Sequence, residues 1–183
     1  MREYVGLTVL VLEYCDTDLF AIATKHANIN LYLDPTYVYE YLLPALRQGL
    51  QQIRAKSLVH LDLRPENILH CFTGFKIADF DRSVVLEKKK EYRMTNIVGG
   101  KASSRFAAPE VLTEQKFSYS ADLYSLGAIL EWCLTGHVAD PTINLNAVAG
   151  PTLNLLISTL RLPVSTRLTW TQFTAYDDRW RQI

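Results

Sequence analysis

Four short polar motifs follow one another along this chain in a fixed order. They are HLDLRPEN at His60–Asn67, DFD at Asp79–Asp81, APE at Ala108–Glu110 and DLYSLG at Asp122–Gly127. Each motif alone is weak evidence, because an isolated Asp-Phe-Asp is usually a turn. Their combination, in this order and at this spacing, constrains the fold more than any other feature of the sequence.

The spacing of apolar residues predicts several helices. Residues 37–56 carry an apolar stripe at helical spacing, and Asp34 stands before it as an expected N-cap. Pro44 lies inside this stripe and should kink the helix or shift its start. Residues 121–134 are apolar with few breaks, which indicates a buried helix. Two more helices are expected, at 153–160 and from a capping box that begins at Thr169.

Short strands are expected around the first two motifs. The apolar run at Leu7–Leu12 predicts a buried strand, and Asp16–Asp18 a polar turn after it. Three segments, 59–61, 68–70 and 75–77, are too short for helices and indicate strands. Residues 82–105 are polar and irregular, as in a long functional or mobile loop. The fold class is therefore mainly α, of the α+β type.

Composition excludes several classes of protein. Lys and Arg together number 19, as do Asp and Glu, so the formal net charge is zero. A binder of nucleic acid or of a membrane surface would usually carry a basic excess, so neither partner is expected. No apolar run has the length needed to span a bilayer. We expect a cytoplasmic protein, with the nucleus as the alternative.

The three cysteines, Cys15, Cys71 and Cys133, are an odd number without paired spacing. This pattern predicts no disulfide framework and favours a reducing compartment.

In their order and spacing, the four motifs resemble the C-terminal lobe of a eukaryotic-type Ser/Thr protein kinase. The resemblance runs from about Leu7 to the last helix, which is nearly the whole chain. It implies a helical bundle in which short β-hairpins carry the catalytic and metal-binding loops. It also implies ATP and Mg²⁺ as cofactors, and phosphoryl transfer to protein hydroxyls as the activity.

The resemblance assigns the chemistry of the site to four residues. Asp62 would orient the attacking hydroxyl and accept its proton. Asn67 and Asp79 would supply the oxygen ligands that Mg²⁺ prefers. Arg64 stands where Ser/Thr kinases usually carry lysine, and it keeps a positive charge near the γ-phosphate.

By the same resemblance, the segment LEYC that ends at Cys15 is the hinge that faces adenine. The carbonyl of Glu13 and the amide of Cys15 would meet the adenine edge, and Asp18 would reach the ribose. Leu69 and Ala78 would line the floor of the adenine site and the space behind it.

Other polar residues match structural positions of the family. Glu110 is expected to pair with Arg167, and Asp122 to accept hydrogen bonds from the backbone of the catalytic loop. Ser103 occupies the position of a threonine that contacts this loop. His60 is most simply a core histidine bonded to backbone.

Several positions depart from the family pattern. Leu61 replaces the arginine that normally receives a phosphate on the activation loop, for which Thr95 is the nearest acceptor. Asp81 replaces a glycine and adds a negative charge beside the metal site. About 16 residues separate Gly136 from Leu153, so the substrate-docking helix of the family is expected to be short or missing.

In the family, a glycine-rich loop, a strand lysine and a helix glutamate precede the hinge. Here Met1 falls just before the hinge strand, and the sequence contains no G-x-G-x-x-G. We therefore expect a single domain over 1–183, truncated at its N-terminus. The hinge strand and hinge would occupy 1–18, and the C-terminal lobe 19–183.

Two functions stay open. The first is a Ser/Thr protein kinase that is inactive or very weak alone, because the phosphate-binding loop and lysine are missing. The second is a non-catalytic kinase mimic that binds another kinase, a regulator or a substrate protein through the face around Leu12, Tyr14 and Leu69. Such truncated mimics of host proteins are common in viruses, which leaves a viral origin open.

Overall fold

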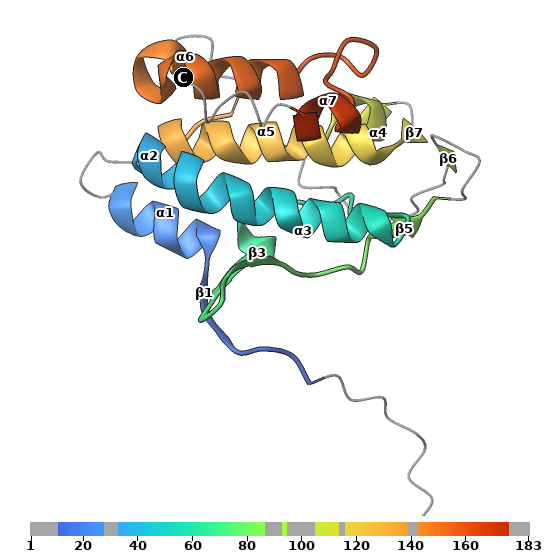
Figure 1. Ribbon diagram of the computed structural model, residues 1–183, viewed down its shortest axis with the longest axis horizontal. Coiled ribbons are helices and arrows are strands. Elements are labelled where there is room, and N and C mark those ends of the chain that lie inside the picture. Colours follow the sequence, from blue (N-terminus) through green and yellow to red (C-terminus); the bar gives the residue numbers. More distant parts are fainter. Residues whose placement is uncertain are drawn as a thin grey trace, which may run out of the picture.

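The central helix of the fold is α5 (Tyr119–Thr135), which packs against α3 (Leu43–Ala55), α6 (Leu145–Leu160) and α7 (Trp170–Ala175) (Figure 1). The computed structural model describes residues 11–27, 33–86, 93–94, 105–113, 116–138 and 143–175. Helix α5 carries apolar residues on all sides, and neighbouring elements bury most of its surface. This helix was predicted over 121–134, and the structure extends it by a few residues.

Both ends of α5 have the caps that the sequence favours. The hydroxyl oxygen of Ser118 accepts a hydrogen bond from the amide of Ser120 at 3.2 Å. At the other end Gly136 has a φ of 72°, and its amide donates to the carbonyl of Trp132 at 2.7 Å. Glycine fits this left-handed position because it has no Cβ.

The predicted effect of Pro44 is present as a shifted start of the helix: α3 begins at Leu43, one residue before the proline. Asp34 caps a short helix α2 (Pro35–Tyr37), accepting hydrogen bonds from the amides of Thr36 and Tyr37. A π-helical turn, η1 (Val38–Leu42), follows and leads into α3. Proline has no amide hydrogen to donate, and the wider turn before it accommodates that loss.

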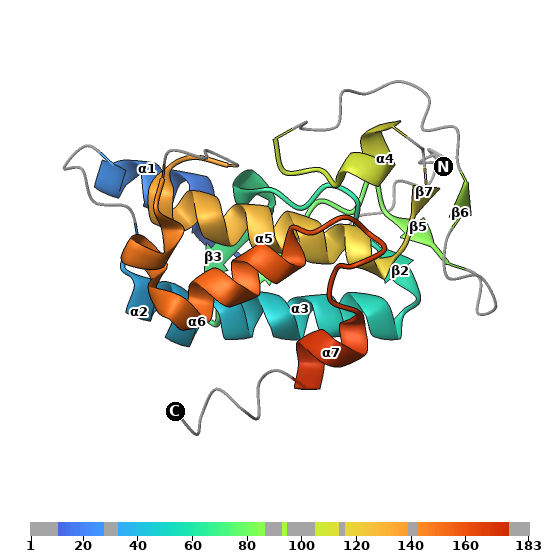
Figure 2. The same ribbon diagram turned by 90° about the horizontal axis from the view of Figure 1, so that it is seen from above.

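The other helices frame this core (Figure 2). Gly150 has a non-helical backbone, which kinks α6 before Pro151. Helix α7 begins with the expected capping box, in which Thr169 and Gln172 exchange hydrogen bonds. The remaining helical elements are α1 (Leu19–Ala27), η2 (Pro65–Asn67) and α4 (Pro109–Thr113).

Within the described ranges, the strands form three small antiparallel sheets. One has the order β1-β3-β4, one pairs β2 with β5, and one pairs β6 with β7. The strands are β1 (Cys15–Asp18), β2 (Leu58–Val59), β3 (Ile68–Cys71), β4 (Gly74–Ile77), β5 (Val84–Val85), β6 (Arg93–Met94) and β7 (Lys116–Phe117). The expected strands at 59–61, 68–70 and 75–77 match β2, β3 and β4 within a few residues.

The structure corrects the prediction for the start of the chain. Val11 and Leu12 lie outside any strand and are 92% and 80% exposed, so the described end of the expected strand is not buried. The polar segment Asp16–Asp18, expected as a turn, belongs to β1. Pairing with β3 decides this, because backbone hydrogen bonds to a neighbouring strand outweigh the weak strand preference of aspartate.

A second correction concerns the cysteines. Cys15 and Cys71 form a disulfide, whereas the odd count and irregular spacing predicted none. The two residues face each other in the antiparallel register of β1 and β3. That register depends on the tertiary fold, so spacing along the chain carries no signal of the pairing. Cys133 is a buried free thiol, and burial raises its pKa.

Across the described ranges, no helix combines the length and the apolar character needed to cross a bilayer.

Candidate active site

The HLDLRPEN loop is attached to the N-terminal part of α5 through Asp122. The two carboxylate oxygens of Asp122 accept hydrogen bonds from the backbone amides of His60, at 2.8 Å, and Leu61, at 3.0 Å. This is the contact expected from the sequence. Burial raises the pKa of Asp122, and the two amide bonds oppose that shift. Leu61 has a φ of 64°, a rare conformation for a branched side chain, and the anchor holds the loop in it.

The ring of His60 joins this loop to the segment before the DFD motif. Its Nε2 lies 3.0 Å from the carbonyl oxygen of Ala78, and its Nδ1 accepts from the amide of Asp62 at 3.3 Å. Because Nδ1 accepts from the amide, Nε2 is the ring nitrogen that donates to the carbonyl. The ring also lies 5.0 Å from that of Phe80, centroid to centroid. His60 is therefore the buried, backbone-bonded histidine expected from the sequence.

Asp62 and Asn67 lie side by side. The turn η2 carries Asn67 back toward Asp62, and the Nδ2 of Asn67 donates to the carbonyl oxygen of Asp62 at 2.9 Å and to its carboxylate at 3.3 Å. Because Nδ2 is the donor in both bonds, Oδ1 lies on the other side of the amide and can face a cation. The Asp62 side chain keeps 14% of its surface exposed.

A backbone hydrogen bond holds the segment before Asp79 against the loop that carries Asp62 and Asn67. The amide of Ala78 donates to the carbonyl of Asn67 at 2.9 Å, so the DFD segment follows the end of the catalytic loop. Asp79 has a φ of 63°, which is strained for a residue that is not glycine. Strained residues of this kind concentrate at functional sites. The backbone bond of Ala78 thus places Asp79 one residue away from a contact with the loop that carries the expected base, Asp62, and the other expected metal ligand, Asn67.

The donor set fits Mg²⁺ in its chemistry. Asn67 and Asp79 offer an amide oxygen and a carboxylate, and Mg²⁺ typically takes one or two carboxylates and completes its shell with water and substrate phosphates. Among the described residues, no group of three or more His, Cys, Asp or Glu side chains is placed to hold a metal ion.

Arg64 makes a contact that the motif did not predict. Its guanidinium donates to both carboxylate oxygens of Glu66, from Nε at 2.9 Å and from Nη2 at 2.8 Å. These hydrogen bonds raise the pKa of Arg64. Partial burial opposes ionisation of Glu66, yet the same bonds hold its pKa below its usual range. Glu66 therefore offsets the charge that was expected to face the γ-phosphate.

A second cation near Asp62 comes from Arg82. Its Nε lies 4.0 Å from the carboxylate of Asp62. No pattern in the sequence predicts this contact, because Arg82 belongs to an irregular segment whose path the sequence does not indicate. The one sequence feature that associates Arg82 with the site is its position directly after the DFD motif.

The expected ion pair between Glu110 and Arg167 is present and buried. Two parallel hydrogen bonds of 2.6 and 3.0 Å join the guanidinium to the carboxylate. Arg167 also donates to the carbonyls of Ser120 and Leu162, and its guanidinium lies 4.9 Å from the ring centre of Tyr124. This network ties α4 to the start of α5 and to the segment before α7.

The expected hinge residues lie at the β1 end of the molecule. The carboxylate of Glu13 accepts from the hydroxyl of Thr73 at 2.6 Å, and that of Asp18 accepts from the amide of Ala21 at the start of α1. Cys15 lies opposite Cys71 in the sheet that also contains Leu69, and Ala78 directly follows β4. Leu69 and Ala78 are both partly exposed. Ser103 and Thr95 lie outside the described residues.

Comparison with known proteins shows which family this chain is similar to. A family model described as "Protein kinase domain" matches residues 6–148. Serine/threonine-protein kinase ATG1b of Arabidopsis thaliana is 34% identical over 141 residues, which cover 74% of this chain and 18% of that protein.

Two other relatives are also serine/threonine-protein kinases and match most of this chain. Serine/threonine-protein kinase unc-51 of Caenorhabditis elegans is 32% identical over 139 residues, covering 69% of this chain and 15% of that protein. Serine/threonine-protein kinase atg1 of Dictyostelium discoideum is 27% identical over 165 residues, covering 78% of this chain and 23% of that protein. The chain thus spans about a fifth of the length of the curated relatives it matches.

Proposed function

Because this chain belongs to the protein kinase family, we propose that it carries the catalytic-loop half of a site for ATP- and Mg²⁺-dependent phosphoryl transfer to Ser or Thr hydroxyls. One observation carries the proposal. The side chain of Asn67 bonds to Asp62, while its backbone carbonyl bonds to the residue before Asp79. Asp62, Asn67 and the backbone just before Asp79 are thereby joined by hydrogen bonds.

In this proposal each residue has a distinct task. Asp62 accepts the proton of the attacking hydroxyl, and Asn67 keeps the Asp62 carboxylate oriented through its amide. Asn67 and Asp79 would hold Mg²⁺, which when bound would neutralise charge on the transferring phosphate. Glu13, Cys15, Asp18, Leu69 and Ala78 would receive the nucleoside.

We further propose that these residues alone transfer phosphate slowly or not at all. Arg64 must leave the carboxylate of Glu66 before its charge can serve a phosphate, and two charge-assisted hydrogen bonds resist that step. The printed sequence also contains no G-x-G-x-x-G loop to enclose the phosphates. The same residues can therefore hold a nucleotide more readily than they can catalyse its reaction.

A binding role without catalysis is the second candidate, and exposed apolar side chains near the hinge favour it. Leu12 and Tyr14 are 80% and 82% exposed, and Phe72 in the β3–β4 turn is fully exposed. Clustered exposed apolar residues of this kind mark partner sites. In this role the chain would engage another kinase, a regulator or a substrate protein.

A thermal-shift titration with ATP, with and without Mg²⁺, tests the proposed site. We expect ATP with Mg²⁺ to raise the melting temperature, because a ligand that binds the native state stabilises it. Asp79→Ala should lose the Mg²⁺-dependent part of the shift. Glu40→Ala is the control: it removes an exposed carboxylate on η1, outside the candidate site, and should keep the shift.

A further variant separates nucleotide binding from phosphoryl transfer. Asp62→Ala should keep the ATP shift and abolish any incorporation of labelled phosphate into a protein substrate. A Mg²⁺-dependent shift that survives in Asp79→Ala would refute the assignment of this residue. The absence of any shift at millimolar ATP would refute nucleotide binding and leave the binding role.

A further inference from the structure

Arg82 lies in a tight turn that is attached to the catalytic loop. The amide of Ser83 donates to the carbonyl of Phe80 at 2.9 Å, which closes the turn with Arg82 at its third position. The hydroxyl of Ser83 donates to the carbonyl of His60 at 3.4 Å. Strand β5, which follows this turn directly, pairs with β2. The backbone on which Arg82 stands is therefore fixed next to the loop that carries Asp62.

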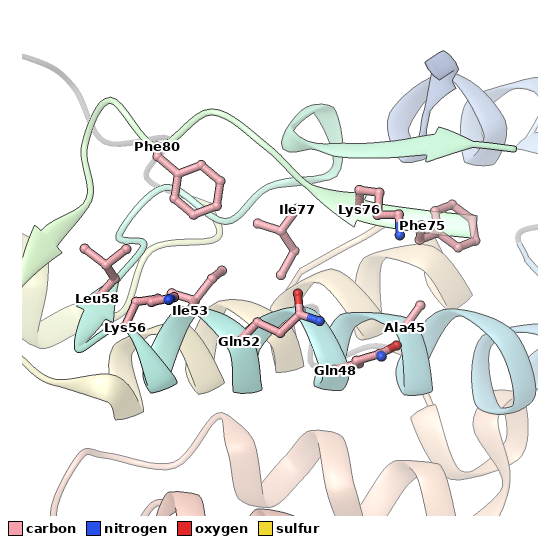
Figure 3. A pocket seen from close by; sticks show the side chains of 11 residues that line it. Ala45, Gln48, Gln52, Ile53, Lys56, Leu58, Phe75, Lys76, Ile77 and Phe80 are labelled. Carbon is pink, nitrogen blue, oxygen red and sulfur yellow. The ribbon is translucent and has the colours of Figure 1, made fainter. Parts of the chain in front are cut away.

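The aromatic ring of Phe80, the first residue of this turn, makes a further contact with the same loop. It lies 5.0 Å from the ring of His60, centroid to centroid. Phe80 also lines a cavity beside α3, together with Leu58 of β2 (Figure 3). The contacts of Phe80 and Ser83 hold the turn at both ends and limit the positions that the side chain of Arg82 can reach.

The guanidinium of Arg82 has hydrogen-bonding capacity that the described residues leave unused. Its Nε lies 4.0 Å from the carboxylate of Asp62, which is too far for a hydrogen bond but close enough for Coulombic attraction. Over the ranges that the structure describes, this guanidinium donates no hydrogen bond, and 32% of the side-chain surface is exposed. Arginine carries five donors in a planar fork that matches carboxylates and phosphates. The fork is thus open to an anion that approaches Asp62.

The cation of the HLDLRPEN loop itself, Arg64, is already engaged. It donates two hydrogen bonds to the carboxylate of Glu66, at 2.9 and 2.8 Å. Charge-assisted pairs of this bidentate kind are among the stronger hydrogen-bonded contacts in proteins. A new anion would have to displace Glu66 from Arg64, whereas at Arg82 it would meet donors without such a partner.

A nucleotide brings negative charge to a part of the chain that already holds several carboxylates. Asp62 lies in the catalytic loop, and Asp79 and Asp81 belong to the DFD motif. Because like charges repel, each further phosphate group of a ligand needs a compensating cation. Arg82 is a cation beside Asp62 whose donors are available for this purpose.

We propose that Arg82, and not Arg64, contacts the γ-phosphate of ATP. This inference rests on the proposed function and adds a contact that the four motifs do not assign. The planar fork would donate to two oxygens of the terminal phosphate. One guanidinium would then be close to both the phosphate and the proposed base, Asp62. Because ADP lacks the γ-phosphate, the contact should be measurable as tighter binding of ATP than of ADP.

Isothermal titration calorimetry with ATP and with ADP, at one Mg²⁺ concentration, measures this preference. Arg82→Gln should lower the affinity for ATP by about tenfold or more, because a hydrogen bond to a charged group is lost, and should change the affinity for ADP much less. Arg82→Lys keeps the charge without the fork and should lose less of the preference. Lys25→Gln is the matched control, because it removes one positive charge from an exposed position on α1 and should leave both affinities unchanged.

A double variant tests which arginine makes the contact. Arg64→Gln/Glu66→Gln removes the ion pair without changing the net charge, and should keep the preference for ATP. Loss of the preference in this variant, with retention in Arg82→Gln, would assign the contact to Arg64 and overturn the inference. The melting temperature of each unliganded variant shows that it is folded. If Arg82→Gln did not fold, Arg82→Lys would provide the same comparison.

The outcomes also separate a failure of this inference from a failure of the proposed function. If the wild type binds ATP and ADP equally, or if Arg82→Gln weakens both nucleotides to the same extent, the nucleotide site remains and the contact of Arg82 with the γ-phosphate is refuted. If the wild type binds neither nucleotide at millimolar concentration, the proposed function is refuted and this inference with it.

Discussion

Replacing Arg167 by alanine is expected to lower the free energy of unfolding by about 3–5 kcal/mol. The substitution removes both hydrogen bonds to Glu110 and the bonds to two backbone carbonyls. It leaves the carboxylate of Glu110 buried without its cation, which accounts for most of the cost. The loss is a large fraction of the 5–15 kcal/mol that typically stabilises a domain. Guanidinium chloride unfolding measures it.

Companion variants separate the charge from the packing. Glu110→Gln keeps the shape and one acceptor, so it should fold and be destabilised less than Arg167→Ala. The double variant Glu110→Leu/Arg167→Met removes both charges, and should be closer to the wild type than Arg167→Ala because no buried charge remains. If the double variant were as unstable as Arg167→Ala, the isolated carboxylate would not be the cause.

Reduction of the Cys15–Cys71 disulfide is the second large effect. The bond joins residues 56 positions apart, and the loop-closure relation for such a separation gives about 4 kcal/mol of stabilisation. We therefore expect dithiothreitol to lower the melting temperature and the guanidinium midpoint. The effect acts through the unfolded chain, which the cross-link makes less free.

The third cysteine provides the control. Cys133→Ala keeps the disulfide and should retain the response to dithiothreitol, whereas Cys15→Ser should have lost it. Thiol titration of the non-reduced protein in denaturant should find a single reactive group, since Cys133 is the described free cysteine. Three titratable thiols, or equal stability with and without dithiothreitol, would contradict the bond.

Much of the candidate site follows from residue type and order. The family was identified from the four motifs, and the family model confirms it. The anchor from Asp122 to the catalytic loop and the pair between Glu110 and Arg167 are both present as expected. These contacts can be predicted because each depends on a polar side chain at a fixed place in a motif.

Other features of the site could not be predicted in this way. The pairing of Arg64 with Glu66 depends on the turn η2, which brings two residues of one motif face to face. Arg82 reaches Asp62 through an irregular segment that no periodicity describes. The functional roles of Asp62, Asn67 and Asp79 stay predictions until nucleotide binding and transfer are measured.

The order of residues along this chain was sufficient for α3, α5, α7 and the second half of α6, because these depend on local spacing and on residue chemistry. It did not predict α1 or the first half of α6. The tertiary structure decided what depends on distance in space. It placed Cys15 opposite Cys71, turned Asp16–Asp18 into a strand, and brought Arg82 close to Asp62. Strand register and helix packing bring distant residues together, and neither leaves a periodic trace in the sequence.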